Sequence, residues 1–173
     1  YPLPEAQIDR FMLKVLTDYP SHDEELTVVQ RSLEPVPALN QVLALDDLKL
    51  LQGRVANVHV DPQLIGWVVS IATATRRPAE HGIPSVAPYI SFGASPRGPI
   101  SVVAAARAMA LLRGRDHVIV SDIEAVLRDA LRHRLVLSYQ ALAEEVTADA
   151  VLEEVLKAVP APQIDLNRAP AAA

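Results

Sequence analysis

The chain has 173 residues, of which half are hydrophobic and only 4% are aromatic, and its formal net charge is −5 at pH 7. This length suits one ordinary domain, or one compact domain with an appended piece, and the core must be built from Leu, Val, Ile and Ala. The acidic net charge argues against a general nucleic-acid-binding protein, and the lack of cysteine excludes disulfides and thiolate metal sites.

The first predicted elements are a short helix over residues 3–11, with Pro4 at its first position, and an apolar strand over residues 11–16. A lone strand is not stable by itself, so its sheet would lie upstream of this chain. We therefore assign residues 1–20 to the end of an α/β domain.

Three helices are predicted next. Ser21 and Glu24 form a capping-box pattern at the start of the first, and Asp46 and Asp61 can cap the other two. Hydrophobic residues recur at helical spacing after each cap. Residues 76–94 then contain three prolines and two glycines, which indicates an ordered but irregular excursion.

The sequence GASPRGP at residues 93–99 ends this excursion. Ser95 is a good N-cap and Pro96 suits a first helical position, so Arg97 would lie in the first turn. A cation is unfavourable there, at the positive end of the helix dipole, unless an anion joins it. Free backbone N–H groups, the dipole and the guanidinium could together bind one phosphate. The alternative is a corner whose arginine simply reaches solvent.

The helix that follows, residues 99–113, is apolar nearly all round, which predicts a central, buried helix. We expect Ser121 or Asp122 to cap an amphipathic helix after it and Thr147 to cap a last one. From residue 97 to residue 134, seven arginines stand against four acidic residues. This balance predicts a locally basic face suited to a discrete anionic ligand.

The predicted fold class is therefore all-α. A helical bundle over residues 21–159 follows the helix–strand remnant of an α/β core at residues 1–20, and residues 160–173 form a flexible tail. His133 and Arg134 would close a helix, where cations suit the C-terminal dipole. We interpret His133, like the other histidines, as structural.

No stretch of the sequence is long and apolar enough for a membrane span, and no signal peptide is recognisable. We therefore expect a cytoplasmic protein. The chain begins at Tyr1 rather than at methionine, and we interpret this start as a cut within a longer protein.

Three segments together resemble MoxR-type AAA+ ATPases. Residues 1–11 (YPLPEAQIDRF) are similar to the end of the ATPase core, residues 93–97 (GASPR) to the sensor-2 segment, and residues 131–139 (LRHRLVLSY) to the terminal lid segment. The resemblance extends to about residue 160. It implies that the chain is the C-terminal part of such an ATPase, comprising the end of its core and its helical lid.

The resemblance also implies roles for individual residues. Arg10 falls at the arginine finger, which reaches the γ-phosphate of ATP held by the neighbouring subunit. Ser95, Pro96 and Arg97 fall at sensor 2, which touches the phosphates of the subunit's own nucleotide. Both roles match the need for cations around a transferring phosphoryl group.

The sequence departs from a complete ATPase in one main respect. It contains no G-x-x-x-x-G-K-[ST] phosphate-binding loop and no apolar strand that ends in an acidic pair for Mg²⁺. We expect the chain alone not to hydrolyse ATP, with Mg²⁺ held by an upstream core. A second, smaller departure is Gly98, which stands where the family resemblance leads us to expect alanine after sensor 2.

Arg10 also has an alternative role, which is an ion pair with Glu5 or Asp9 on its own short helix.

The resemblance implies a hexameric ring with a chaperone-like role in the maturation of protein complexes. Its partners would be client proteins and von Willebrand factor A domain proteins, without membrane or specific nucleic acid. One alternative is a non-enzymatic helical interaction module, which an exposed apolar patch would indicate. The other is a DNA-binding module that uses the arginines between residues 97 and 134, against which stand the net charge and the few aromatics.

Overall fold

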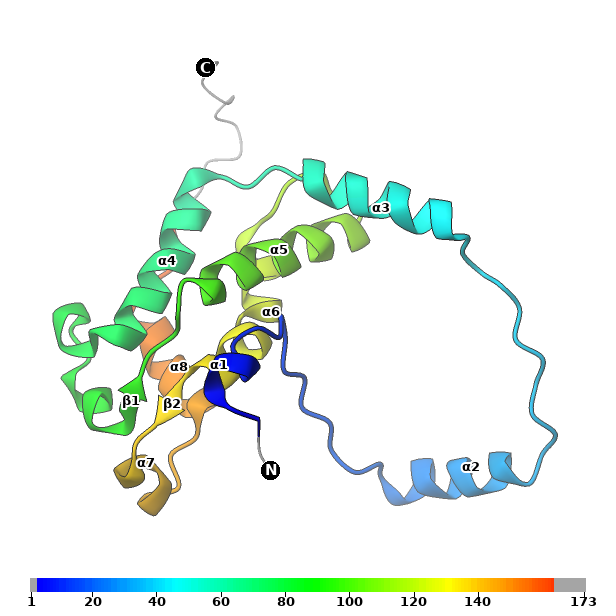
Figure 1. Ribbon diagram of the computed structural model, residues 1–173, viewed down its shortest axis with the longest axis horizontal. Coiled ribbons are helices and arrows are strands. Elements are labelled where there is room, and N and C mark those ends of the chain that lie inside the picture. The colour runs from blue at the N-terminus through cyan, green and yellow to red at the C-terminus, as the bar shows by residue number, and fades with distance from the viewer. Residues whose placement is uncertain (1–2, 164–173) are drawn as a thin grey trace.

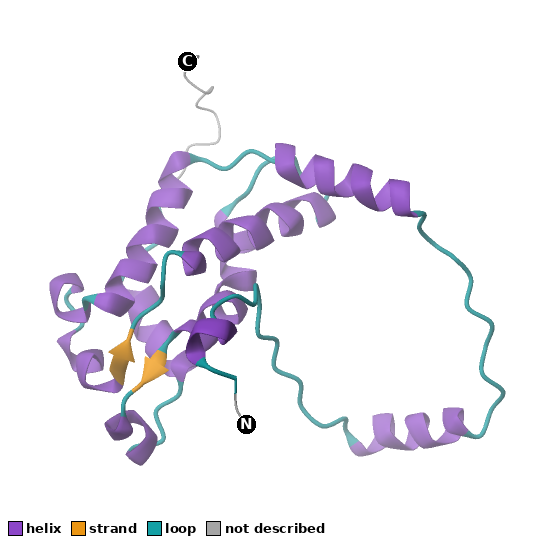
Figure 2. Ribbon diagram, in the orientation of Figure 1, coloured by secondary structure: helices purple, strands orange, loops and turns teal. Residues whose placement is uncertain are grey.

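A computed structural model describes residues 3–163 and confirms a mainly helical fold with one very small sheet (Figures 1 and 2). The helices are α1 (Glu5–Ile8), α2 (His22–Ser32), α3 (Leu45–Asn57), α4 (Pro62–Arg76), α5 (Arg97–Leu112), α6 (Val120–Leu131), α7 (Tyr139–Ala143) and α8 (Ala148–Ala158), with 3-10 turns η1 (Pro78–His81), η2 (Pro84–Tyr89) and η3 (Arg132–Arg134). The strands β1 (Ile90–Phe92) and β2 (Val136–Leu137) pair antiparallel.

The hydrophobic core lies between α4, α5, α6 and α8. Its large, fully buried side chains come from α4, α6 and α8, and they include Leu64, Ile71, Leu127 and Leu152. Helix α5 contributes small buried residues, and its neighbours can therefore pack close to its backbone. The indole Nε1 of Trp67 also donates a hydrogen bond of 2.9 Å to the carbonyl of Val159, which joins α4 to the end of α8.

Helix α5 is central, but the prediction that it is buried all round is wrong. Val102 and Ala106 on one side are completely buried, whereas the side chain of Ile100 is exposed. The helix also begins at Arg97 rather than at Pro99. The exposed apolar side chains of α5 continue onto Ile65 and Val69 of α4, so the two helices share a hydrophobic outer surface.

Three predicted helix caps are confirmed. The Ser21–Glu24 capping box is complete, with the Ser21 N–H donating to the Glu24 carboxylate over 2.8 Å. The Asp61 carboxylate accepts the N–H of Gln63 at 2.7 Å. Thr147 Oγ1 accepts the N–H of Ala150 at 3.2 Å. These caps use local hydrogen bonds and are therefore readable from sequence.

Two other predicted caps are wrong. In α3 the carboxylate that bonds to the helix start is that of Asp47, which accepts the N–H of Ala44, and not that of Asp46. Helix α6 begins at Val120, so Asp122 lies inside the first turn and accepts the N–H of Ile119 at 3.0 Å. In both cases the acidic side chain reaches back to the residue before the helix.

The strand predicted for residues 11–16 is also absent from the part of the chain that the structure describes. These residues are extended and exposed, and Lys14 donates its N–H to the Asp129 carbonyl at 2.8 Å instead of pairing with a strand. The apolar pattern that predicted a strand is therefore unpartnered in this chain.

Helix α2 lies apart from the bundle at the end of two extended segments (Figure 1). All its residues are exposed, including Leu26 and Val29, and so is Leu33 directly after it. The packed part of the predicted lid thus begins at α3. At the other end Ala161 still contacts the core, and residues 164–173 of the predicted tail lie outside the described residues.

No helix among residues 3–163 has both the length and the apolar character needed to cross a membrane.

Gly93 permits a close contact between the irregular excursion and the end of α4. A Cβ atom at this position would lie 2.5 Å from the carbonyl oxygen of Thr75, and the neighbouring Ala94 N–H donates to Thr75 Oγ1 at 2.9 Å. Both partners are rigid because they belong to buried backbone and to a fully buried side chain. A side chain at residue 93 would therefore push the excursion away from α4.

We expect Gly93→Ala to lower the free energy of unfolding by about 1–3 kcal/mol, as overpacking does. Gly66→Ala in α4 is the matched control, because its Cβ would meet open space. That control should raise stability by about 0.5–1 kcal/mol through its helix propensity. Urea unfolding of both variants checks the expectation, and equal stabilities would contradict it.

Candidate functional site

Ser95 organises the corner at the start of α5. Its hydroxyl oxygen accepts the N–H of Arg97 at 3.2 Å, and its carbonyl accepts the N–H of Gly98 at 2.9 Å. The N-cap is Pro96 and not the predicted Ser95, although the Ser95 hydroxyl still accepts an N–H as a cap does, and Pro99 has no N–H. The expectation that free backbone N–H groups would bind a phosphate here is therefore wrong, since the corner already uses them. The guanidinium of Arg97 is a half-exposed donor at this corner.

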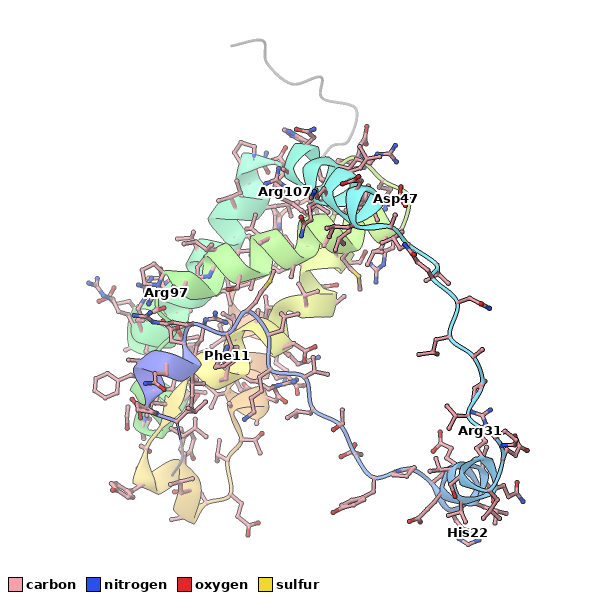
Figure 3. The ribbon with its side chains drawn as sticks, turned by 45° about the vertical axis from the view of Figure 1, so that its right-hand side comes forward. Phe11, His22, Arg31, Asp47, Arg97 and Arg107 are labelled. Atoms are coloured by element: carbon pink, nitrogen blue, oxygen red, sulfur yellow. The ribbon has the colours of Figure 1, made fainter. Side chains whose placement is uncertain are left out.

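Asp9 connects α1 to this corner. Its carboxylate accepts the Ser95 hydroxyl at 2.9 and 3.0 Å and Nη1 of Arg97 at 3.3 Å. On its other side, Oδ1 lies 3.2 Å from Nε of Arg134. Figure 3 shows Arg97 beside the N-terminal helix. One carboxylate therefore serves both a half-exposed and a buried arginine.

Arg134 is almost completely buried and holds several groups at once. Its Nη2 donates to the carbonyls of Asp9 at 3.0 Å and Phe11 at 2.7 Å, and to the Ser101 hydroxyl at 2.9 Å. Its Nη1 donates to the carbonyl of Met12 at 3.2 Å. Burial lowers the pKa of Arg134, and the Asp9 carboxylate opposes that effect.

All three residues of η3 hold residues 9–14, which turn away from the end of α1. Arg132 donates to the carbonyl of Lys14 at 2.9 Å, and His133 Nε2 lies 3.0 Å from the carbonyl oxygen of Phe11. With the contacts of Arg134, this turn fixes the backbone on both sides of Arg10. His133 is thus part of a structural contact, as expected of it from the sequence.

Gly98 allows this arrangement to be compact. A Cβ atom on Gly98 would lie 2.8 Å from Cδ2 of the buried Leu131 and 3.5 Å from Cδ of Arg134. The glycine found where alanine was expected therefore brings the first turn of α5 against the end of α6.

Arg10 and Arg97 both keep accessible side chains. Arg10 is exposed and makes no side-chain hydrogen bond or ion pair with residues 3–163, so the alternative ion pairs with Glu5 and Asp9 do not form. The side chain of Arg97 is 56% exposed although it pairs with Asp9. Each guanidinium can therefore approach an anion presented from outside this chain.

The predicted basic face does not form, because most arginines between residues 97 and 134 bond within the bundle. Arg113 and Arg115 share the completely buried carboxylate of Asp122 at 2.8 and 2.5 Å. Burial would raise the pKa of Asp122, but hydrogen bonds from Arg115 and Ile119 hold it below its usual value. Arg107 donates to the carbonyls that end α3, where a cation suits the helix dipole. These contacts also weaken the DNA-binding alternative.

An apolar groove of about 610 Å³ lies between α4 and α5 and begins at the same corner. Its lining includes Ile65, Val69, Pro96 and Ile100, with Arg76 and Arg107 among the flanking residues. The groove gives the bundle an unpartnered hydrophobic surface, which is the feature that the interaction-module alternative requires.

The residues at the start of α5 suit the phosphates of ATP but not its bound metal ion. An exposed guanidinium at the positive end of a helix dipole can hold a phosphate, and Arg97 meets both conditions. Among residues 3–163, no group of three His, Asp or Glu side chains could hold a metal ion. The described residues therefore offer an exposed guanidinium at a helix start and no cluster of three metal-ligating side chains.

Sequence reasoning missed Asp9 and Arg134 as parts of this site. The LRHR segment at residues 131–134 singled out the right stretch, but only as a family likeness. The burial of Arg134, which requires several acceptors from other segments, is visible only in the structure.

Comparisons with known proteins agree with this architecture. Residues 85–155 match the family model described as the AAA lid domain. The chain is 46% identical over 165 residues to chaperone MoxR1 of Mycobacterium tuberculosis, and this alignment covers 95% of this chain and 44% of that relative. It is 29% identical over 184 residues to protein MoxR of Paracoccus denitrificans, covering 94% of this chain and 52% of that relative.

A solved structure is similar as well. A crystal structure of a protein proposed to be an ATPase, from Cytophaga hutchinsonii, superposes with a TM-score of 0.89 at 34% identity. The match covers 94% of this chain and 50% of that one. The chain thus spans about half the length of the relatives it matches.

The contact between η3 and residues 9–14 should respond to pH through His133. Burial lowers the pKa of His133, the charges of Arg134 and Lys14 lower it further, and the hydrogen bond to Phe11 opposes them. A lowered folded-state pKa means that folding favours the neutral ring. This stabilisation is complete above the unfolded-state pKa of about 6.5 and is lost as the pH falls below it.

We therefore expect the free energy of unfolding to fall less between pH 7.5 and pH 5 in His133→Gln than in the wild type. Urea unfolding at both pH values measures the difference. His22→Gln, at the exposed start of α2, is the control and should keep the wild-type slope. An unchanged slope in His133→Gln would show that this histidine does not contribute.

Proposed function

We propose that this chain, which is the C-terminal region of a MoxR-family AAA ATPase and contains its AAA lid domain, supplies two arginines to ATP hydrolysis. Arg97 acts as sensor 2, with Ser95 and Pro96 setting the corner that presents it to the phosphates of the subunit's own ATP. Arg10 acts as the arginine finger and reaches the ATP of the neighbouring subunit. The groups that hold Mg²⁺ and the rest of the nucleotide come from the ATPase core.

The observation that carries the proposal is the contact between Asp9 and the start of α5. It joins the segment that bears Arg10 to Arg97, although 88 positions of sequence separate Asp9 from Arg97. Both guanidinium groups remain accessible, while the neighbouring Arg134 is buried and bonds within the bundle. Accessible cations are what phosphoryl transfer requires at its developing charge.

We propose the wider role from the family resemblance and from the name of one relative. If Arg10 acts across an interface, the subunits must assemble into a ring. The family resemblance implies that this ring is a hexamer. The relative MoxR1 is named a chaperone. We extend that role to this protein as the remodelling of client complexes in the cytoplasm, with von Willebrand factor A domain proteins as partners.

A protein-interaction role is the second candidate, and the groove between α4 and α5 favours it. The groove combines apolar side chains with the cationic edges Arg76 and Arg107, which suits an apolar segment that carries acidic groups. The two functions are compatible, because an ATPase lid can also carry a docking surface.

Arg97→Ala tests the sensor-2 role in the full-length ATPase. It should weaken nucleotide binding or slow hydrolysis by about 1.5–3 kcal/mol, the free energy of a charge-assisted hydrogen bond. The fold should persist because the side chain is half exposed. Nucleotide titration, ATPase rates and helix content by circular dichroism measure these effects. Arg128→Ala, on the exposed side of α6, is the control. Unchanged activity with a loss of helix would assign Arg97 a structural role.

Arg10→Ala tests the finger role. Because the Arg10 side chain is exposed and makes no hydrogen bond or ion pair with residues 3–163, its removal should leave nucleotide affinity and stability nearly unchanged. Turnover should fall by roughly 10³–10⁵-fold, as in other phosphoryl-transfer systems that lose a finger.

Mixing tests whether Arg10 acts across the interface. Subunits with Arg10→Ala are combined with subunits whose own phosphate-binding loop is disabled. Mixed rings should regain activity where an intact site meets an intact finger. Co-assembly without any recovery, at every mixing ratio, would rule out action in the neighbouring subunit.

A further inference from the structure

The carboxylate of Asp9 lies where a phosphate would compete with it. It accepts Nη1 of Arg97 at 3.3 Å, and the same guanidinium is a half-exposed donor at the start of α5. A phosphate and a carboxylate repel each other at such distances and cannot both have the full attraction of one guanidinium. Because the Arg97 side chain is 56% exposed, it has room to turn from Asp9 toward solvent.

The second partner of Asp9 is different in kind. Arg134 Nε lies 3.2 Å from Asp9 Oδ1, and the side chain of Arg134 is only 1% exposed. This arginine cannot leave, because it also donates to the carbonyls of Asp9, Phe11 and Met12. Asp9 is therefore shared between one arginine that can move and one that cannot.

We infer that Asp9 is a positioning residue that holds Arg97 until a nucleotide phosphate displaces it, and that its carboxylate then pairs more fully with Arg134. The inference rests on the proposed phosphate contact of Arg97. Once Arg97 leaves, Arg134 and the Ser95 hydroxyl are the remaining partners of the carboxylate among the described residues. A stronger pair with Arg134 fixes the backbone on both sides of Arg10.

The consequence is a link between the two sites of one subunit. Binding of ATP at Arg97 makes the segment at residues 9–12 more rigid, and this segment presents Arg10 to the neighbour. Asp9 thus lowers nucleotide affinity and raises turnover. A merely structural aspartate would support both properties together.

Asp9→Asn in the full-length ATPase tests this link, because it removes the charge and keeps the acceptor for Ser95. A fluorescent ATP analogue should bind about 2- to 5-fold more tightly, the range expected when one exposed ion pair no longer competes. Turnover at saturating ATP should fall several-fold. In an Arg97→Ala background, Asp9→Asn should no longer change the affinity.

Two further variants make the test specific. Asp9→Glu keeps the charge and should return the affinity toward the wild-type value. Asp149→Asn removes a different carboxylate, one that pairs with Arg132 of η3 at 3.0 Å, and should leave nucleotide affinity unchanged.

The outcomes separate the inference from the proposed function. If Arg97→Ala alone leaves affinity and turnover unchanged, the sensor-2 role is wrong and the inference falls with it. If Arg97→Ala weakens binding but Asp9→Asn has the same effect with and without Arg97, only the inference is wrong. Looser binding by Asp9→Asn would also overturn it.

Discussion

The guanidinium of Arg134 is almost completely buried, and a charge in that position is stable only where acceptors surround it. The acceptors come from three places: the carbonyls of residues 9, 11 and 12, the Ser101 hydroxyl in α5 and the Ala130 carbonyl in α6. The Asp9 carboxylate completes them with an opposite charge. Removal of this one side chain would take one hydrogen-bond or ion-pair partner from each of these groups.

This constraint explains why the N-terminal segment belongs with the bundle. Residues 9–14 have no strand partner and no buried side chain apart from the half-buried Asp9, yet η3 holds their backbone at several points. The position of Arg10 is therefore set by hydrogen bonds to backbone rather than by packing. Helix α2 has no comparable contact and lies away from the bundle.

The sequence predicted part of what local chemistry controls. The caps at Ser21, Asp61 and Thr147 depend on neighbours within four residues and were predicted correctly, whereas at the starts of α3 and α6 several acidic or hydroxyl side chains were available locally and the predicted caps are wrong. The contact between Asp9 and Arg134 joins residues that are 125 positions apart, so no periodic pattern of hydrophobic residues in the sequence predicts it. The predicted strand at residues 11–16 failed for a similar reason. Its apolar pattern was read correctly, but a strand exists only with a partner, and none lies within residues 3–163.

The account of Arg97 and Asp9 is tested most directly by a structure of the full-length ATPase with a non-hydrolysable ATP analogue. We expect the Arg97 guanidinium within hydrogen-bond distance of a phosphate oxygen and away from Asp9, with Arg134 still bonded to the carbonyls of residues 9, 11 and 12. A nucleotide bound in the site while Arg97 remains on Asp9 would contradict the account.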